Sequence, residues 1–311
     1  MRVMFFGTSA FAVPSLERVV AHHTVTVCVT QPDRPQGRGL VPEPSPVKRT
    51  ALQLGLPLLQ PERLQIGLFE GLKSDVGVVA AYGQLIRQDL LQLPTWGMLG
   101  VHPSLLPKYR GAAPVAWAIL NGETTTGLTI FRLNEQMDAG EWLVQETIPI
   151  EAQETTEGLT ERLAHRGAEV LLRALELLEK RTATFQAQED SAATFAPKLT
   201  KTQGRIDWQQ PAESIVRLVR ATMPWPGAST SWQGSALKLW SVATQAAPAS
   251  CSCESPAAPG TVVEVSPESL AVATGRGTVK ITEIQPAGRR RMSAREFLAG
   301  RSIKVGDRFG T

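Results

Sequence analysis

The chain has 311 residues, of which 42% are hydrophobic and 20% are charged, so we expect two soluble globular domains and exclude an intrinsically disordered chain. No stretch approaches the roughly 20 consecutive apolar residues of a membrane-spanning helix, and the opening MRVMFFGTSAF indicates a first strand rather than a signal peptide. Three cysteines are too few for a disulfide framework, which favours a reducing compartment such as the cytoplasm.

The net charge of +3 is unevenly distributed along the chain. Residues 196–311 carry 15 basic and 8 acidic side chains, a net +7, whereas residues 1–195 carry 17 and 21, a net −4. Such asymmetry indicates a polyanionic partner for the C-terminal part. A solvated basic face without a partner explains the charge equally well.

Short apolar runs alternate with helical patterns through the first half of the chain. The runs cover residues 2–6, 24–30, 76–81, 98–102 and 128–133. Apolar residues near the helical period predict a long amphipathic helix over 157–181. We therefore predict an α/β, Rossmann-like domain at residues 1–190. A dinucleotide site is disfavoured, because Ser9 stands where a G-x-G-x-x-G turn needs its second glycine and the bulky Phe11 follows.

A long loop rich in Pro and Gly follows the second strand, at residues 30–49. Four basic side chains in it can bind phosphates, namely Arg34, Arg38, Lys48 and Arg49. A solvated loop is the alternative.

The segment GMLGVHPSLLPKYRGAAPVAWAILNGE, residues 97–123, combines a strand that ends at His102 with a loop that leads into a helix. A single histidine in that place is more often structural than functional. However, Asp138 in the motif MDAGE follows the predicted strand 128–133. Adjacent strands that end at one sheet edge would bring its carboxylate beside the imidazole.

The helical period is lost after residue 186, so we predict a linker at residues 191–205 and a C-terminal domain at residues 206–311. Short alternating runs cover residues 229–232, 237–242, 261–265, 269–273 and 278–284, a pattern that predicts a small OB-like β-barrel. The insertion at 245–260 is expected to be a surface loop. Its Cys251 and Cys253 are interpreted as loop thiols, because a zinc site needs a second pair of ligands.

Several motifs together resemble the 10-formyltetrahydrofolate-dependent formyltransferases over nearly the whole chain. They are MRVMFFGTSAFA, TQPDRPQGRG, SPVK, VVAAYG, HPSLLPKYRGAAP and MDAGE. The later segments GRIDW, residues 204–208, and MPWP, residues 223–226, are similar to those of the branch that formylates methionyl initiator tRNA in translation initiation. The resemblance implies transfer of a formyl group from 10-formyltetrahydrofolate to the α-amino group of that tRNA. The chemistry requires no metal, and we expect a cytoplasmic monomer.

The reaction itself defines what the site must provide. When an amine attacks the formyl carbon, the amine must lose a proton, the tetrahedral oxyanion must be stabilised, and the departing folate nitrogen must gain a proton. Histidine titrates near neutral pH and can serve these steps, while a nearby carboxylate orients it and favours its charged form. The resemblance assigns these roles to His102 and Asp138.

The resemblance also implies binding residues for both substrates. A folate pocket is expected at two loops, comprising Gln84, Leu85, Ile86, Ser104, Leu105, Leu106 and Pro107. Without the resemblance, packing of these loops against the sheet is the simpler interpretation. For tRNA, the basic loop at residues 30–49 is joined by Arg289, Arg290 and Arg291. Leu40 and Val41 stand where relatives often have lysines, which predicts weaker contacts there.

One departure from the family pattern concerns the strand that ends at His102. The family typically has Asn-x-His, and the Asn supplies an amide donor to the oxyanion, whereas this chain has Gly100-Val101-His102. Loss of one such donor costs about 10²–10³ in rate. We therefore expect residual but reduced activity, and a gain on substituting Gly100→Asn. Two other functions stay open, namely formylation of an amino sugar nucleotide and a decayed paralogue that binds tRNA or folate without catalysis.

Overall fold

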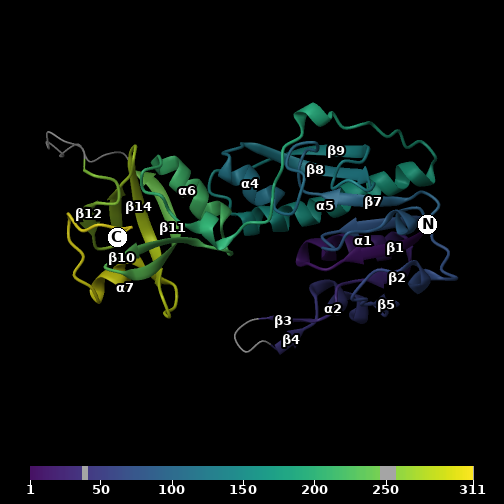
Figure 1. The fold of residues 1–311 in the computed structure, drawn as a ribbon, viewed down its shortest axis with the longest axis horizontal. Coiled ribbons are helices and arrows are strands. Elements are labelled where there is room, and N and C mark those ends of the chain that lie inside the picture. Colours follow the sequence, from purple (N-terminus) through teal and green to yellow (C-terminus); the bar gives the residue numbers. More distant parts are fainter. Residues whose placement is uncertain (37–40, 246–256, 311) are drawn as a thin grey trace. The chain divides into compact units, whose positions relative to one another are not determined.

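The computed structural model describes residues 1–36, 41–245 and 257–310 (Figure 1). The chain divides into two compact units. The N-terminal unit comprises Met1–Pro114, Thr125–Pro149 and Gly158–Pro197, and the C-terminal unit comprises Val115–Thr124, Ile150–Glu157 and Lys198–Thr311. The scheme of a domain at 1–190, a linker at 191–205 and a domain at 206–311 stays a prediction.

A seven-stranded sheet forms the centre of the N-terminal unit, in the order β5-β2-β1-β6-β7-β8-β9 (Figure 1). Its strands are β1 (Arg2–Gly7), β2 (Thr24–Val29), β5 (Leu58–Leu59), β6 (Val76–Ala80), β7 (Met98–His102), β8 (Thr125–Arg132) and β9 (Trp142–Pro149). The first five strands in this order are parallel, and β8 and β9 are antiparallel to their neighbours. Residues 3–6 of β1 are all fully buried, as expected of a central parallel strand. The predicted Rossmann-like α/β domain is confirmed, although β5 and β9 were not predicted.

Helices and short accessory elements complete this unit. They are α1 (Val13–His22), α2 (Pro46–Gln53), α3 (Gln88–Leu91), α5 (Thr156–Glu179), the 3-10 turns η1 (Ala10–Ala12), η2 (Ile66–Phe69) and η3 (Asp190–Ala192), and the strand pair β3 (Arg34–Gln36) and β4 (Val41–Glu43). The long amphipathic helix predicted at 157–181 is confirmed as α5. It packs closely on the sheet, because a Cβ at Gly167 would lie 3.2–3.3 Å from Leu128 of β8 and Val101 of β7. No helix among the described residues is long and apolar enough to cross a membrane.

An antiparallel sheet of short strands forms the C-terminal unit, with the path β10-β11-β14-β13-β12 and β15 beside β14. Its elements are α4 (Pro114–Leu120), η4 (Lys201–Gly204), α6 (Ala212–Ala221), β10 (Ala228–Trp232), β11 (Ser235–Gln245), β12 (Val262–Ser266), β13 (Ser269–Ala273), β14 (Thr278–Pro286), β15 (Met292–Ser293) and α7 (Ala294–Ala299). All five predicted strands are present. Trp208, Ile215 and Phe297 are buried with the inner strand residues in one hydrophobic core.

Both edge strands of this sheet bond to residues 307–310. Val262 at the start of β12 donates its backbone N–H to the carbonyl of Asp307 at 2.8 Å, and Gly310 donates to Ser231 of β10 at 2.8 Å. Paired edges of this kind are protected from joining other chains. The arrangement is compatible with the predicted OB-like barrel, whose full closure stays a prediction. Cys251 and Cys253 lie outside the described residues.

Candidate active site

His102 is the last residue of β7, and the two nitrogens of its ring face different groups. The side chain is almost fully buried. Nε2 lies 2.9 Å from the carbonyl oxygen of Tyr109, and a carbonyl can only accept a hydrogen bond. Nε2 therefore carries a proton, and Nδ1 is the nitrogen that can gain or lose one. Nδ1 faces the Oδ2 atom of Asp138 at 3.7 Å.

Asp138 lies in the loop between β8 and β9, in a left-handed backbone conformation with φ of +51°. Its Oδ2 atom accepts a hydrogen bond of 2.8 Å from the backbone N–H of Gly111. This same oxygen is the one nearest His102. The predicted neighbourhood of His102 and Asp138 is therefore present, with the carboxylate aimed at Nδ1.

The reason for this neighbourhood differs from the one predicted. Since β8 is antiparallel to β7, the end of β8 lies beside the start of β7, and Leu133 donates its N–H to the carbonyl of Met98 at 2.8 Å. The two strands do not end at one sheet edge. Asp138 reaches His102 because the loop after Leu133 folds back along β7.

Gly100 lies on β7 two residues before His102, and the space beside it is filled. A Cβ at this position would lie 2.4 Å from Cε1 of Phe131 and 2.8 Å from Cδ1 of Leu133. The ring of Phe131 also meets that of His102 edge-to-face, with centroids 6.4 Å apart. Apolar side chains thus occupy the place in which the family's Asn would begin.

The predicted folate loop Ser104–Pro107 is tightly bonded to the sheet. Leu106 is buried, its N–H donates to the Thr129 hydroxyl at 3.1 Å, and its carbonyl accepts from Gln145 at 2.6 Å. The hydroxyl of Ser104 donates to the carbonyl of Lys108 at 2.6 Å. Leu105 and Pro107 are partly exposed, so these two are the members of the loop available to a ligand.

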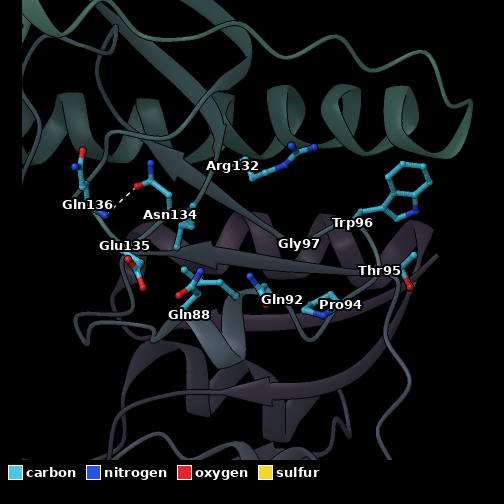
Figure 2. A pocket seen from close by; sticks show the side chains of 12 residues that line it. Gln88, Gln92, Pro94, Thr95, Trp96, Gly97, Arg132, Asn134, Glu135 and Gln136 are labelled. Carbon is cyan, nitrogen blue, oxygen red and sulfur yellow. Dashed lines mark hydrogen bonds between the residues drawn. The ribbon is translucent and has the colours of Figure 1, made fainter.

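Two cavities lie beside α3. One of about 440 Å³ is lined by the predicted residues Leu85 and Ile86 together with Arg87, Gln88, Asp89 and Glu135. A second of about 730 Å³ shares Gln88 and Glu135 with it. Figure 2 shows the polar side chains that line the second cavity, among them Gln88, Gln92, Arg132, Asn134 and Gln136. These amides give no signal in the sequence, because isolated Gln and Asn residues resemble those of an ordinary protein surface.

Neither His102 nor Asp138 lines either cavity. Residues 132–136, which line the second cavity, lead along the chain into the loop that carries Asp138. Within the described residues, no group of three His, Cys, Asp or Glu side chains could hold a metal ion.

The predicted basic residues of the N-terminal loop are largely paired. Arg34 bonds to Glu62 at 3.1 Å, and Lys48 bonds to Asp33 at 2.6 Å. Hydrogen bonds from Lys48 and from Gln60 lower the pKa of Asp33. Arg49 donates to the carbonyl of Pro44. Arg38 and Leu40 lie outside the described residues.

The C-terminal arginines are exposed and partly paired. Arg290 forms an ion pair with Glu296, and Arg291 with Glu283. The guanidinium of Arg291 also lies over the ring of Trp240, 5.2 Å from its centroid. Any phosphate contact here would compete with these carboxylates.

Comparison with known proteins agrees with this arrangement. The family described as "Formyl transferase" matches residues 1–175, and "Formyl transferase, C-terminal domain" matches residues 198–302. The chain is 43% identical over 316 residues to a methionyl-tRNA formyltransferase of a Roseiflexus species, covering 100% of this chain and 95% of that protein. It is 44% identical over 314 residues to one of Thermus thermophilus, covering 100% and 99%.

Solved structures share the fold at low identity. The sugar 3N-formyl transferase WlaRD superposes with a TM-score of 0.69 at 15% identity, covering 93% of this chain and 99% of that one. HypX from Aquifex aeolicus, solved with tetrahydrofolic acid, superposes with a TM-score of 0.65 at 21% identity, covering 96% and 47%. With both of its parts matched and relatives above 40% identity along its whole length, the chain belongs to the formyl transferase family.

Proposed function

We propose that this protein transfers the formyl group of 10-formyltetrahydrofolate to the α-amino group of methionyl initiator tRNA. The observation that carries the proposal is the match of 43–44% identity to methionyl-tRNA formyltransferases, which extends through the C-terminal unit as well as the site. The sugar formyltransferases among the solved structures share the fold at 15–18% identity. Translation initiation is the process that uses the product.

The chemistry of the transfer needs one proton acceptor and one proton donor near the formyl carbon. The amine forms a bond to that carbon, its carbonyl electron pair moves to oxygen, and the bond to the folate nitrogen N10 then breaks. The amine gives up one proton, and N10 takes one up, so the overall reaction is balanced. Nδ1 of His102 is placed to handle these protons, because Nε2 is committed to the Tyr109 carbonyl.

Asp138 lies beside the nitrogen that handles these protons. Its Oδ2 atom is 3.7 Å from Nδ1, so a carboxylate faces that nitrogen whenever it carries a proton. The imidazolium can in turn donate to the developing oxyanion or to N10. A preorganised donor of this kind lowers the barrier without reorganisation at the moment of reaction.

We assign the folate to the two cavities beside α3. Their amide side chains can pair with the polar edge of a pterin, while Leu85 and Ile86 offer apolar surface. Gln84 and the loop Ser104–Pro107 are proposed as further parts of the folate site, with Leu105 and Pro107 as its contacts. The folate acts as a substrate here, and no step requires a metal.

We assign the tRNA phosphates to the basic residues predicted above, Arg34, Arg38, Lys48, Arg49, Arg289, Arg290 and Arg291. The net +7 of residues 196–311 supports this assignment for the C-terminal three. The pair His102 and Asp138 comes from one chain, so the reaction needs no second copy, and we propose a monomer that acts in the cytoplasm.

An assay that compares two formyl acceptors tests the function. The purified chain is given labelled 10-formyltetrahydrofolate with methionyl initiator tRNA in one arm and a dTDP-linked amino sugar in the other. We expect formyl methionyl-tRNA as the product of the first arm and none in the second. Formylation of the sugar alone would replace the proposed acceptor. Binding of tRNA without product at high enzyme concentration would support the decayed paralogue.

A further inference from the structure

Residues 186–196, which we call the strap, follow α5 in the sequence and bond to both loops of the candidate active site. Gln186 exchanges two backbone hydrogen bonds of 2.9 Å with Trp142, just after the Asp138 loop. Thr194 accepts from the backbone N–H of Tyr109 through its hydroxyl at 2.9 Å, and its carbonyl accepts from Arg110 at 2.9 Å. The strap therefore contacts the supports of His102 and of Asp138 alike.

Gln188 in the strap uses its side-chain amide on two sides. Nε2 donates to the carbonyl oxygens of Asp138 at 2.8 Å and Gly140 at 2.7 Å. Oε1 accepts from Nε of Arg110 at 3.1 Å and from its Nη2 at 2.8 Å. A carbonyl only accepts and a guanidinium only donates, so a single orientation of the amide satisfies all four bonds.

Arg110 is a nearly buried cation, with 7% of its side chain exposed, and its guanidinium bonds to the strap at two residues. Besides Gln188 it bonds to Asp190, from Nη2 to Oδ1 at 2.7 Å. Its chain neighbour Gly111 holds the Asp138 carboxylate. The same short stretch thus fixes the Asp138 carboxylate directly and the Asp138 backbone through Gln188.

The Asp138 loop needs such support. Its backbone φ of +51° at Asp138 is one that residues with a side chain adopt rarely. A Cβ at Gly140 would lie 1.7 Å from the carbonyl oxygen of Arg132, so the turn after Asp138 is tight. A loop with these features keeps one conformation only when surrounding contacts determine it. Gln188 provides two such contacts, one on each side of Ala139.

We propose that Gln188 is a positioning residue for formyl transfer, which holds the Asp138 loop so that the carboxylate faces Nδ1 of His102, and that Arg110 holds the amide of Gln188 in the required orientation. The proposal rests on the proposed function, because it assigns Gln188 to the pair that carries the reaction. Gln188 itself touches no reacting atom. Its effect on the rate comes from geometry, and a misplacement of about 1 Å can cost about 100-fold.

Two substitutions separate positioning of the loop from attachment of the strap. Gln188→Ala removes all four hydrogen bonds. Gln188→Glu keeps an acceptor for Arg110, but it puts an oxygen against the carbonyls of Asp138 and Gly140, which then repel it. Gln186→Ala is the matched control, because Gln186 lies in the same strap with an exposed side chain and bonds through its backbone.

The full chain carrying each substitution is measured for kcat and KM with methionyl-tRNA and for thermal unfolding. We expect kcat to fall about 10- to 100-fold in both Gln188 variants, with KM within about threefold and the control unchanged. If Gln188→Glu folds and keeps kcat within about twofold of the unsubstituted chain, attachment of the strap through Arg110 is its whole role and the proposal is wrong.

A second readout needs no turnover. Histidine-selective ¹⁵N labelling reports the ring nitrogens of His102 against pH, with the resonance assigned from a His102→Gln variant. We expect the Nδ1 signal and its pH dependence to change in Gln188→Glu and to stay unchanged in Gln186→Ala. An unchanged signal in Gln188→Glu contradicts the proposal. If the unsubstituted chain formylates nothing, the proposed function fails, while this spectrum still decides whether Gln188 positions Asp138.

Discussion

The His102 ring has one nitrogen committed to structure and one available for chemistry. Nε2 donates to the carbonyl of Tyr109, and this bond sets the orientation of the ring as well as its tautomer. Nδ1 faces Asp138. A substituting side chain can therefore reproduce the structural contact and still lack the proton transfer, so the two roles of His102 are separable.

Replacing His102 with Ala should leave almost no formyl transfer. General acid–base catalysis by a positioned side chain contributes about 10²–10⁴ in rate, and both proton transfers are assigned to this ring. Single-turnover transfer from labelled 10-formyltetrahydrofolate measures the loss. His165→Ala serves as control, because His165 is an exposed residue of α5. If the His102→Ala variant retains roughly a tenth of the activity, the catalytic centre lies elsewhere.

The gain expected from Gly100→Asn alone must be revised in view of Phe131 and Leu133. The new Cβ would collide with both side chains, and Phe131 is buried and unable to move far without repacking. We predict that Gly100→Asn alone is destabilised and no faster. In combination with Phe131→Met, whose flexible side chain can move aside, the Asn should increase the rate. The increase should approach the factor of roughly 10²–10³ that one oxyanion donor contributes.

The comparison is between the double variant and Phe131→Met alone, in the same single-turnover assay. A rate equal in these two would show that an amide at position 100 adds nothing here, and that the site compensates in another way.

At the scale of elements, the sequence predicted the helices and strands whose hydrophobic pattern is local. The buried runs of β1 and β6, the stripe of α5 and the five short strands of the C-terminal sheet all follow from periodicity. The antiparallel direction of β8 does not, because strand direction depends on what the strand pairs with. Gln188 was missed for a similar reason, since a segment without periodicity gives no sign that it bonds to loops some fifty and eighty residues earlier.

The residues that bond both edge strands of the C-terminal sheet offer a test of that unit. Phe309 is 2% exposed, and its ring lies 5.9 Å from that of Trp208. Replacing it with Ala should lower the free energy of unfolding by about 3–5 kcal/mol, the usual cost of removing a buried aromatic ring. Urea unfolding followed by circular dichroism measures the change. Val305→Ala, at a residue 65% exposed, should change it by less than about 0.5 kcal/mol.

For the whole molecule, the charge asymmetry of the sequence was informative about the partner but not about which cations are available. Residues 196–311 carry the net +7, yet Arg290 and Arg291 are paired with Glu296 and Glu283. Pairing of this kind depends on the fold. Likewise the motifs predicted the family from the sequence alone. The filling of the space beside Gly100 could not be predicted in this way, because it depends on how β8 packs against β7.

Binding of tRNA should weaken strongly with salt. Each phosphate that a cation neutralises contributes roughly 0.7–0.9 to the slope of log K against log salt concentration. Replacing Arg289, Arg290 and Arg291 together with Ala should reduce the slope by up to about 2.7, and by less where their carboxylate partners already hold them. Arg173→Ala on α5 is the control, since Arg173 is exposed, paired with Glu146, and outside the predicted interface. An affinity that does not vary between low and moderate salt would rule out this interface.

The strap also determines where this chain can be recombined with a relative. The two family matches leave residues 176–197 between them, so a chimera could be joined at either end of that interval. A junction at 176 would take Gln188 and Thr194 from one parent and Arg110 and Tyr109 from the other. A junction at 198 keeps every bond between the strap and the catalytic loops within a single parent, which makes it the crossover point for exchanging residues 198–311 without separating the strap from those loops.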